Sequence, residues 1–448
     1  MTTGAVEHVI RAPRAVVDGV VRSTAIGLAD GMIRAVDSFD AGFGGVSETV
    51  LDTEVVLLPG LVDTHVHINE PGTDWEGFAS ATAAALAGGI TTVVDMPLDS
   101  DPVTTTVAAL EGKRSVADGA CRVDTGFWGG IVPANLASFS ALAGAGVLGF
   151  KCFLSESGNP DFPPLDPHQF RAAMAVVAQL DSVLLVHAES QRVLTDCPAP
   201  AGRSYDEFLR SRPDAAELDA VSIVLDAVAE TGARAHIVHV SSAQVLPLIA
   251  QAKAAGLPVT AETCPHYVTF AAEAIPDGAT VFAACPPIRG RDNRDRLWAA
   301  LADGTLDMVV SDHSPCAGEH KDLIGGDFGR AFGGISSLQI ALPALWTHAA
   351  RAGFGLPDVC RWMAQAPAEL AGLADRGVIA AGKRADFCVF DPDPTWVVHG
   401  ADLRHRHPLT PYEGLPLTGV VRQTWRAGRV AGDDSRGQLL HAGIREPA

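Results

Sequence analysis

Six residues that could bind metals or move protons each stand at the end of a short apolar run. They are His65, His67, Lys151, His187, His239 and Asp312. His65 and His67 are two residues apart, so both side chains point to the same side of a strand. One histidine at a strand end is usually structural, but four imidazoles and a carboxylate that converge form a metal site. Their number suits two divalent cations.

Lys151 is the unusual member of this set, because the chain has only five lysines and this one directly follows the apolar residues GVLGF in the run GVLGFKCF. Burial of an ammonium without a partner is costly. The lysine could pair with a carboxylate, form a Schiff base, or react with CO2 to give a carbamate. The neighbouring histidines favour the carbamate, because an anionic bidentate ligand bridges two cations, whereas a free ammonium repels them.

His236 serves as an internal comparison, because it lies three residues before His239. On a strand this spacing turns its side chain to the opposite side, toward the helices. We therefore expect His236 to be structural. The same expectation holds for seven histidines outside the set: His8, His168, His348, His399, His405, His407 and His441.

Eight apolar runs of strand length are expected to position the six residues. They occupy residues 61–68, 90–97, 121–130, 146–153, 182–189, 234–242, 257–267 and 306–315. Ala-rich stretches with helical spacing separate them, and strands that are apolar nearly throughout are typical of parallel sheets. Eight β–α units predict an α/β fold, a (β/α)8 TIM-like barrel with its active site at the carboxyl ends of the strands. A doubly wound sheet is the alternative, which the lack of G-x-G-x-x-G after the first run disfavours.

The two ends of the chain have a different pattern from the middle. Residues 1–58 and 377–448 contain short segments punctuated by Gly and Asp, without helical periodicity. We predict that both ends combine into one small β-sandwich domain. Residues 59–376 then form the barrel.

The composition favours a cytoplasmic enzyme and excludes several other classes. The chain has 448 residues, of which 47% are hydrophobic, and a net charge of −20. This charge argues against binding to nucleic acid or to an anionic membrane, and the N-terminal segment has no secretion-signal pattern. The eight cysteines stand singly without a C-x-x-C pair, so we expect neither a zinc ribbon nor a disulfide framework.

The ordered set of segments resembles the cyclic amidohydrolase branch of the amidohydrolase superfamily over nearly the whole chain. The segments are GLVDTHVHI, GFKCF, LLVHAE, HIVHVSS, CPHY, CPPIR, VSDHSPC and GKRADFCVFDP. Within this branch the chain is most similar to the allantoinase family, through HINEPGTDWEGF, GGISSLQ and RHRHPLTPYEG. The resemblance implies hydrolysis of a small cyclic ureide, the opening of the hydantoin ring of allantoin to allantoate, by a homotetramer.

The resemblance also implies a ligand role for each member of the set. His65 and His67 bind the more buried of two divalent ions, and His187 and His239 bind the more exposed one. Lys151, carrying CO2 as N6-carboxylysine, bridges both ions. Zinc is the first expectation for the metal, and cobalt, manganese and iron are the alternatives.

Asp312 has two implied roles, as a ligand of the buried ion and as the proton shuttle. It takes a proton from the bridging hydroxide that attacks the ring carbonyl and delivers it to the departing ring nitrogen. Cys152 and Cys316 are possible nucleophiles near the set. With a hydroxide available, we expect both to be packing thiols.

Two departures from related patterns guide the choice of substrate. Asn69 stands where dihydroorotases carry an Arg that pairs with the substrate carboxylate, and CFLSESG lacks the Tyr that follows the lysine in hydantoinases and dihydropyrimidinases. The predicted substrate-binding residues are Asn69, Ser155, His266, Cys285, Gly333 and Gly334. The alternatives are a hydantoinase or dihydropyrimidinase, then a dihydroorotase, then a non-catalytic scaffold, which the complete ligand set disfavours.

Overall fold

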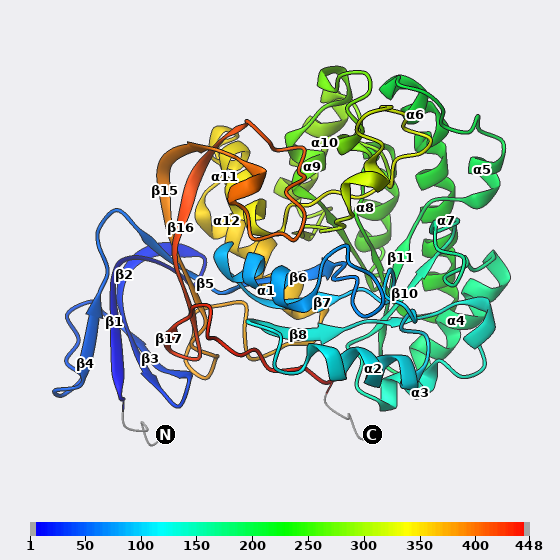
Figure 1. Cartoon of the computed structure of the whole chain (residues 1–448). Helices are drawn as coiled ribbons and strands as arrows, with labels where there is room; N and C mark the ends of the chain where they lie inside the picture. Colours follow the sequence, from blue (N-terminus) through cyan, green and yellow to red (C-terminus); the bar gives the residue numbers. More distant parts are fainter. Residues whose placement is uncertain (1–5, 443–448) are drawn as a thin grey trace.

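The computed structural model describes residues 6–442, in which a barrel and a β-sheet built from both chain ends lie side by side (Figure 1). The barrel strands are β6 (Leu61–Val66), β7 (Ile90–Asp95), β8 (Asp124–Phe127), β9 (Gly129–Gly130), β10 (Phe150–Phe153), β11 (Val183–His187), β12 (Arg234–Ile237), β13 (Val259–Thr263) and β14 (Met308–Val309). Strands that follow one another along the chain are neighbours and pair in parallel. Strands β8 and β9 are two parts of one strand position. A parallel bridge between Val66 and His313 joins the last position to the first. The predicted eight-stranded barrel is therefore confirmed.

Helices follow the barrel strands and cover the barrel from outside (Figure 1). The longer ones are α1 (Phe78–Ala87), α2 (Val107–Ala117), α4 (Pro167–Gln179), α7 (Asp214–Thr231), α8 (Leu246–Ala254), α10 (Arg291–Asp303) and α11 (Ala341–Arg351). Shorter helices are α3 (Ser140–Gly144), α5 (Gln191–Thr195), α6 (Tyr205–Ser211), α9 (Pro265–Thr269), α12 (Leu356–Cys360) and α13 (Ala366–Leu370).

Helix α4 shows how the local sequence specifies these elements. Asp166 accepts hydrogen bonds from the backbone of residues 168 and 169, and the Gln169 side chain bonds back to the Asp166 N–H. This capping box satisfies N–H groups that the first turn cannot pair internally. Phe170, Met174 and Val177 recur at helical spacing and are buried against the strands. The apolar stripe thus fixes which face of the helix meets the barrel.

The sheet beside the barrel contains strands from both ends of the chain. They are β1 (His8–Val17), β2 (Val20–Ala29), β3 (Met32–Asp37), β4 (Ser47–Val50), β5 (Val56–Pro59), β15 (Phe387–Val397), β16 (Pro416–Arg426) and β17 (Arg429–Val430). Strand β15 pairs antiparallel with β5, which joins the two ends in one sheet. The strands pair continuously in the order β17-β16-β15-β5-β1-β2-β3, with β4 on β1, rather than in two separate sheets. Ile10, Leu57, Phe387 and Trp425 belong to the separate apolar core of this domain. We propose domain boundaries at 58/59 and 376/377.

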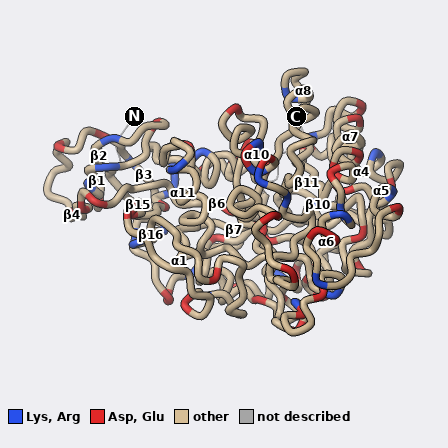
Figure 2. The backbone as a smooth tube through the Cα atoms, turned by 90° about the horizontal axis from the view of Figure 1, so that it is seen from above, with Lys and Arg blue, Asp and Glu red and all other residues tan. Residues whose placement is uncertain are grey.

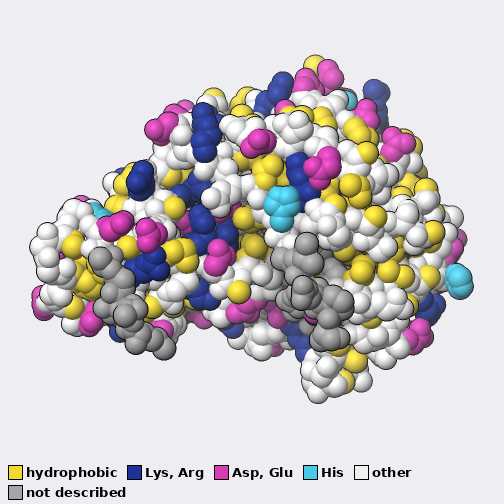
Figure 3. Space-filling view, turned by 90° about the horizontal axis from the view of Figure 1, so that it is seen from below, with side chains coloured by type: hydrophobic (Ala, Val, Ile, Leu, Met, Phe, Trp, Pro, Cys, Tyr) yellow, Lys and Arg dark blue, Asp and Glu magenta, His cyan; other side chains and the backbone are white. Residues whose placement is uncertain are grey.

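A buried ionic cluster joins this sheet to the barrel. Asp124, the first residue of β8, contacts Arg376 at 3.1 Å, Arg384 at 3.3 Å and also Arg426. Seen from below, acidic and basic side chains gather where the smaller and larger parts of the molecule meet (Figure 3). Arg384 and Arg426 flank the β15–β16 hairpin, so the cluster fastens that hairpin to the barrel.

The C-terminal part of the chain also reaches the loop after β6. The backbone N–H of Arg406 donates to Glu76 Oε1 at 3.1 Å, and His407 Nε2 donates to the Asp74 carbonyl at 2.9 Å. The other oxygen of Glu76 accepts from His313 Nε2 at 3.2 Å. The loop that follows His67 is therefore held from two sides.

Charged residues of both signs are interspersed along the chain (Figure 2). Among residues 6–442, no helix combines the length and apolar character that a membrane crossing requires.

Candidate metal centre and substrate pocket

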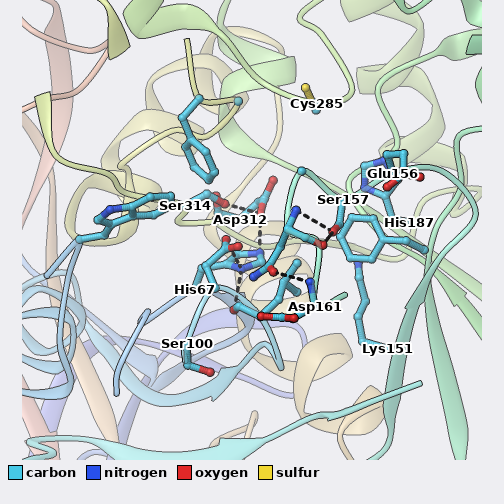
Figure 4. Close-up of a pocket in the computed structure, with 18 of the residues that line it drawn as sticks. His67, Ser100, Lys151, Glu156, Ser157, Asp161, His187, Cys285, Asp312 and Ser314 are labelled. Carbon is cyan, nitrogen blue, oxygen red and sulfur yellow. Dashed lines mark hydrogen bonds and ion pairs between the residues drawn. The ribbon is translucent and has the colours of Figure 1, made fainter. Parts of the chain in front are cut away.

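The structure brings the six residues together at one pocket of about 700 Å³ at the carboxyl ends of the barrel strands. Lys151 lies within β10 and His187 ends β11, while His239 and Asp312 follow β12 and β14 by two and three residues. His65 lies within β6 and His67 directly after it. Figure 4 shows His67, Lys151, His187 and Asp312 from separate elements at this pocket.

His65, His67 and Asp312 form the tightest group at the pocket. Asp312 Oδ1 lies 3.1 Å from His65 Nε2 and 3.6 Å from His67 Nε2. One ligand atom from each of the three lies within 4.8 Å of the others. Two imidazoles and a carboxylate at this spacing fit one divalent cation.

The second nitrogen of each imidazole is held by a buried acceptor. His65 Nδ1 donates to Glu262, and His67 Nδ1 donates to the Leu98 carbonyl at 3.3 Å. Each ring therefore carries a proton on Nδ1 and turns its Nε2 toward Asp312. Such partners orient metal-binding histidines and set their tautomer.

His187 is held in the opposite sense. Its Nε2 donates to Glu189 at 2.7 Å, which leaves Nδ1 as the free ligand atom. Arg212 donates to both oxygens of Glu189. Burial opposes ionisation of Glu189, but Arg212 and the His187 bond hold the pKa of this carboxyl well below its usual range. Burial lowers the pKa of His187 to about 4, so the ring is the neutral imidazole that metals bind.

His239 and Asp312 adopt left-handed backbone conformations that non-glycine residues rarely use. Their φ angles are +38° and +44°, and Asn69 in the same region has +61°. Such strain persists where the surrounding structure enforces it, and it gathers at functional sites. The His239 ring lies 4.6 Å from the His187 ring. Burial lowers the pKa of His239, so this ring too is neutral.

Lys151 is 1% exposed, and its Nζ has no hydrogen-bond partner among the described residues. No ion pair to a carboxylate is present for it within residues 6–442, which disfavours the pairing alternative. Nζ lies 5.0 Å from the centre of the Phe153 ring. Burial lowers the pKa of Lys151 to about 8, so the neutral, nucleophilic amine is within reach.

The expected orientation of His236 toward the helices is wrong. Its Nε2 donates to Glu262 at 2.8 Å and its Nδ1 accepts from Thr260 at 2.7 Å. The His236 side chain therefore lies on the same side of the sheet as Glu262, which also binds His65. The prediction assumed that side chains alternate between the two faces of a strand from His236 to His239. This alternation fails because β12 ends at Ile237 and His239 has a positive φ. His236 binds Glu262 and thereby supports the ligand shell indirectly.

The predicted substrate-binding residues divide into two groups. Cys285 and Gly333 line the pocket. The others do not line it, although they lie nearby: Asn69, Ser155, His266 and Gly334. The Asn69 side chain donates to the Pro315 carbonyl at 3.1 Å, which turns its amide into the protein. Their contact with substrate stays a prediction.

Lys321 organises one wall of the pocket, and the sequence analysis missed it. Its buried Nζ donates to the carbonyl oxygens of Ala283 at 3.2 Å and Phe332 at 2.7 Å, and also to that of Gly334. These bonds tie together the two segments that carry Cys285 and residue 333. No spacing signal marks this lysine, because its partners are backbone carbonyls in two loops.

The other supporting residues were also missed. Glu189 leaves a faint signal, since it follows the strand-end histidine His187 in HAE. Glu262 leaves only its place as a charged residue within the apolar run 257–267. Trp75 and Phe332 form an aromatic wall of the pocket, with ring centres 4.7 Å apart and edge-to-face geometry.

Comparisons with known proteins agree with this fold and site. The amidohydrolase family model matches residues 56–431. The chain is 50% identical to an allantoinase of Streptomyces avermitilis over 99% of both chains, and 45% identical to an allantoinase of Saccharomyces cerevisiae over 85% of this chain and 84% of that one. An L-hydantoinase (dihydropyrimidinase) from Arthrobacter aurescens superimposes with a TM-score of 0.88 at 26% identity, covering 98% of both chains. The barrel and its histidine-lined mouth define a hydrolase of metal-dependent type, and the chain belongs to the amidohydrolase family.

Proposed function

We propose that this enzyme hydrolyses a cyclic amide bond of allantoin and releases allantoate. One observation carries the proposal: all six predicted ligand and proton-transfer residues line a single pocket in a chain that is half identical, end to end, to an allantoinase. A hydantoinase or dihydropyrimidinase is the alternative, and the structural likeness to L-hydantoinase is its support.

The donor set fits two divalent cations. One cation would be held by His65, His67 and Asp312, and the other by His187 and His239. A carboxylated Lys151 would contribute to both sites. When bound, the cations supply a water whose pKa is lowered toward about 7 and polarise the scissile carbonyl. Zinc is our first proposal, with cobalt, manganese or iron as alternatives.

Carboxylation of Lys151 would resolve its unpartnered burial. The ammonium first loses one proton to give the free amine. The amine attacks CO2, a C–N bond forms and a second proton leaves to solvent, so a buried cation becomes an anion. The resulting carbamate attracts divalent cations, whereas an ammonium at the same place would repel them. Support comes from the unpartnered Nζ and from the absence of an ion-pairing carboxylate in the described part of the chain.

Asp312 is the proposed proton carrier. Ser314 Oγ donates to its Oδ1 at 2.9 Å and holds the carboxylate at the pocket wall. Burial raises the pKa of Asp312, while His65 opposes this shift. A carboxylate of raised pKa takes a proton from attacking water and returns it to the leaving ring nitrogen.

The pocket wall suits a neutral cyclic ureide with a polar substituent. Trp75 and Phe332 offer flat apolar surface to a planar ring. Asp99, Ser100 and Asn159 line another part of the pocket and can bond to the ureido group that hydantoin lacks.

An anionic substrate such as dihydroorotate is less well matched to this wall. The arginine among the described lining residues is Arg212, and Glu189 already pairs with it. We also propose a homotetrameric assembly, which the family resemblance implies, and a cytoplasmic location, which the composition favours.

The test is a comparison of kcat/KM for allantoin, hydantoin, dihydrouracil and dihydroorotate with one preparation of known metal content. We expect allantoin to exceed each of the others by at least about 100-fold, or roughly 2.7 kcal/mol. If allantoin reacts no faster than dihydrouracil, the substrate proposal fails and the hydrolase chemistry stands.

A further inference from the structure

Cys264 and His266 stand beside Asp312 but belong to neither proposed ligand set. A sulfur, a ring nitrogen and a carboxylate oxygen of these three residues lie within 4.8 Å of one another. Cys264 directly follows β13, and His266 is the second residue of α9. Both are buried, with exposed fractions of 0% and 1%.

His266 is unusual because neither ring nitrogen has a hydrogen-bond partner among the described residues. Its ring packs edge-to-face on Tyr267, with centres 4.1 Å apart. Buried polar atoms are nearly always paired, and leaving one unpaired is costly. Burial lowers the pKa of His266 to about 3, so the ring stays in the neutral form that binds metals. A buried neutral imidazole beside a thiol and a carboxylate is thus available as a ligand.

We propose that Cys264, His266 and Asp312 form a further cation site, selective for soft divalent ions such as Cd²⁺ and excess Zn²⁺. Sulfur and imidazole ligands favour these ions over Mg²⁺ and Ca²⁺. Binding breaks the S–H bond of Cys264, forms a sulfur–metal bond and releases one proton to solvent. The two proposed catalytic ligand sets contain imidazoles but no sulfur, so a cadmium–thiolate band would report this site and not those two.

The geometry requires only a small adjustment. Tetrahedral sites with metal–ligand bonds of about 2.0–2.3 Å place ligand atoms about 3.5 Å apart, so atoms now within 4.8 Å of one another approach by about 1.3 Å at most. The side chain of Asp312 is 13% exposed and lines the substrate pocket, which gives the ion a route to the buried pair.

Occupation of this site would withdraw Asp312 from His65 and His67. Soft cations in excess are therefore inhibitors that act through the proton carrier. This consequence rests on the role proposed for Asp312, whereas cation binding itself does not.

The test titrates the metal-loaded enzyme with CdCl2 and records the ultraviolet thiolate-to-cadmium charge-transfer band together with allantoin hydrolysis. We expect one saturable band per chain, and inhibition that follows the same curve. Cys264→Ser should remove the band, and His266→Gln should weaken cadmium affinity by about 10–100-fold. Cys316→Ser is the matched control, because Cys316 is equally buried but joins no such group among the described residues.

A band that survives Cys264→Ser, or that disappears in Cys316→Ser, overturns the proposal. X-ray absorption at the cadmium edge of the unsubstituted enzyme gives a second readout that does not depend on variant folding. One sulfur with nitrogen and oxygen neighbours supports the site, and an all-oxygen shell refutes it. Allantoin turnover before cadmium is added tests the proposed function separately, so the two failures are distinguishable.

Discussion

At the scale of single residues, Lys151 is defined by what surrounds it. Its neighbours at the pocket include His187 and His239, whose pKa values burial lowers, and among the described residues no acceptor bonds to its Nζ. Burial lowers its pKa to about 8 because water no longer stabilises the ammonium. A side chain in this state is better suited to become a carbamate than to remain a cation.

Replacement of Lys151 by Ala should remove the bridging ligand. We expect kcat to fall by at least about 1,000-fold and the metal content per chain to fall from two toward one or none. Small carboxylic acids should restore part of the activity by occupying the empty position. Enzyme assays with metal analysis of the same samples measure both effects.

Lys151→Arg is the matched variant, because it keeps a cation but has no primary amine to carboxylate. It should be as inactive as Lys151→Ala and should not respond to carboxylic acids. Substantial activity in either variant would contradict the carbamate.

At the scale of elements, strand ends place the proposed ligands, and loops form much of the pocket wall. Lys321 connects the two loops through three carbonyl oxygens, those of Ala283, Phe332 and Gly334. Removing a buried donor leaves those acceptors unpaired, at about 1–3 kcal/mol for each that finds no other partner. The pocket wall therefore depends on a residue outside the metal centre.

Lys321→Met should raise KM for allantoin about 10-fold while kcat and metal content change little. The reason is that the backbone next to Cys285 and Gly333 loosens, whereas the ligand residues keep their supports. Steady-state kinetics with metal analysis provide the measurement. Lys253→Met is the control, since Lys253 bonds to Asp307 and Gly304 away from the pocket and should leave KM unchanged. Loss of metal with unchanged KM would refute the positioning role.

At the scale of the whole molecule, the barrel and the terminal sheet depend on each other. Asp124 of the barrel faces Arg376, Arg384 and Arg426 in a buried cluster. The segment around Arg406 reaches back to Glu76 in the loop after β6. The C-terminal segments are therefore part of the support of the active-site mouth.

Asp124→Asn should destabilise the enzyme by about 3 kcal/mol, because several buried guanidinium groups lose their shared counter-charge. For a chain of this size the expected fall in Tm is about 3 °C. Thermal unfolding of the metal-loaded protein gives the measurement.

Asp391→Asn is the comparison, since Asp391 pairs with Arg422, whose side chain is 50% exposed, and should cost about 1 kcal/mol or less. An equal loss of stability in the two variants would show that the buried cluster at Asp124 stabilises the protein no more than the exposed pair does.

The gathering of the six residues at one pocket was predictable because it follows a local rule. Parallel strands are apolar until they end, and the first polar residues lie at the carboxyl face of a barrel. His187 at the end of β11 and Lys151 near the end of β10 obey this rule directly. The barrel itself was predictable for the same reason, since eight apolar runs repeat with helical segments between them.

The orientation of His236 was not predictable from spacing. Alternation holds only within a strand, and the chain leaves β12 before it reaches His239. The bond from His236 to Glu262 crosses from one strand to the next, and a single sequence carries no record of which residues face each other across strands.

The amino-acid order by itself determined the residue types, the strand ends and hence the kind of chemistry, because strand periodicity is a local property of the chain. Only the tertiary structure decided which ring nitrogen of His187 and of His65 faces the pocket, because Glu189 and Glu262 approach their imidazoles through the fold. It also decided that the amine of Lys151 is buried without a partner and that Cys264 and His266 meet Asp312. These features depend on contacts between distant segments, whose directions are set when the barrel closes.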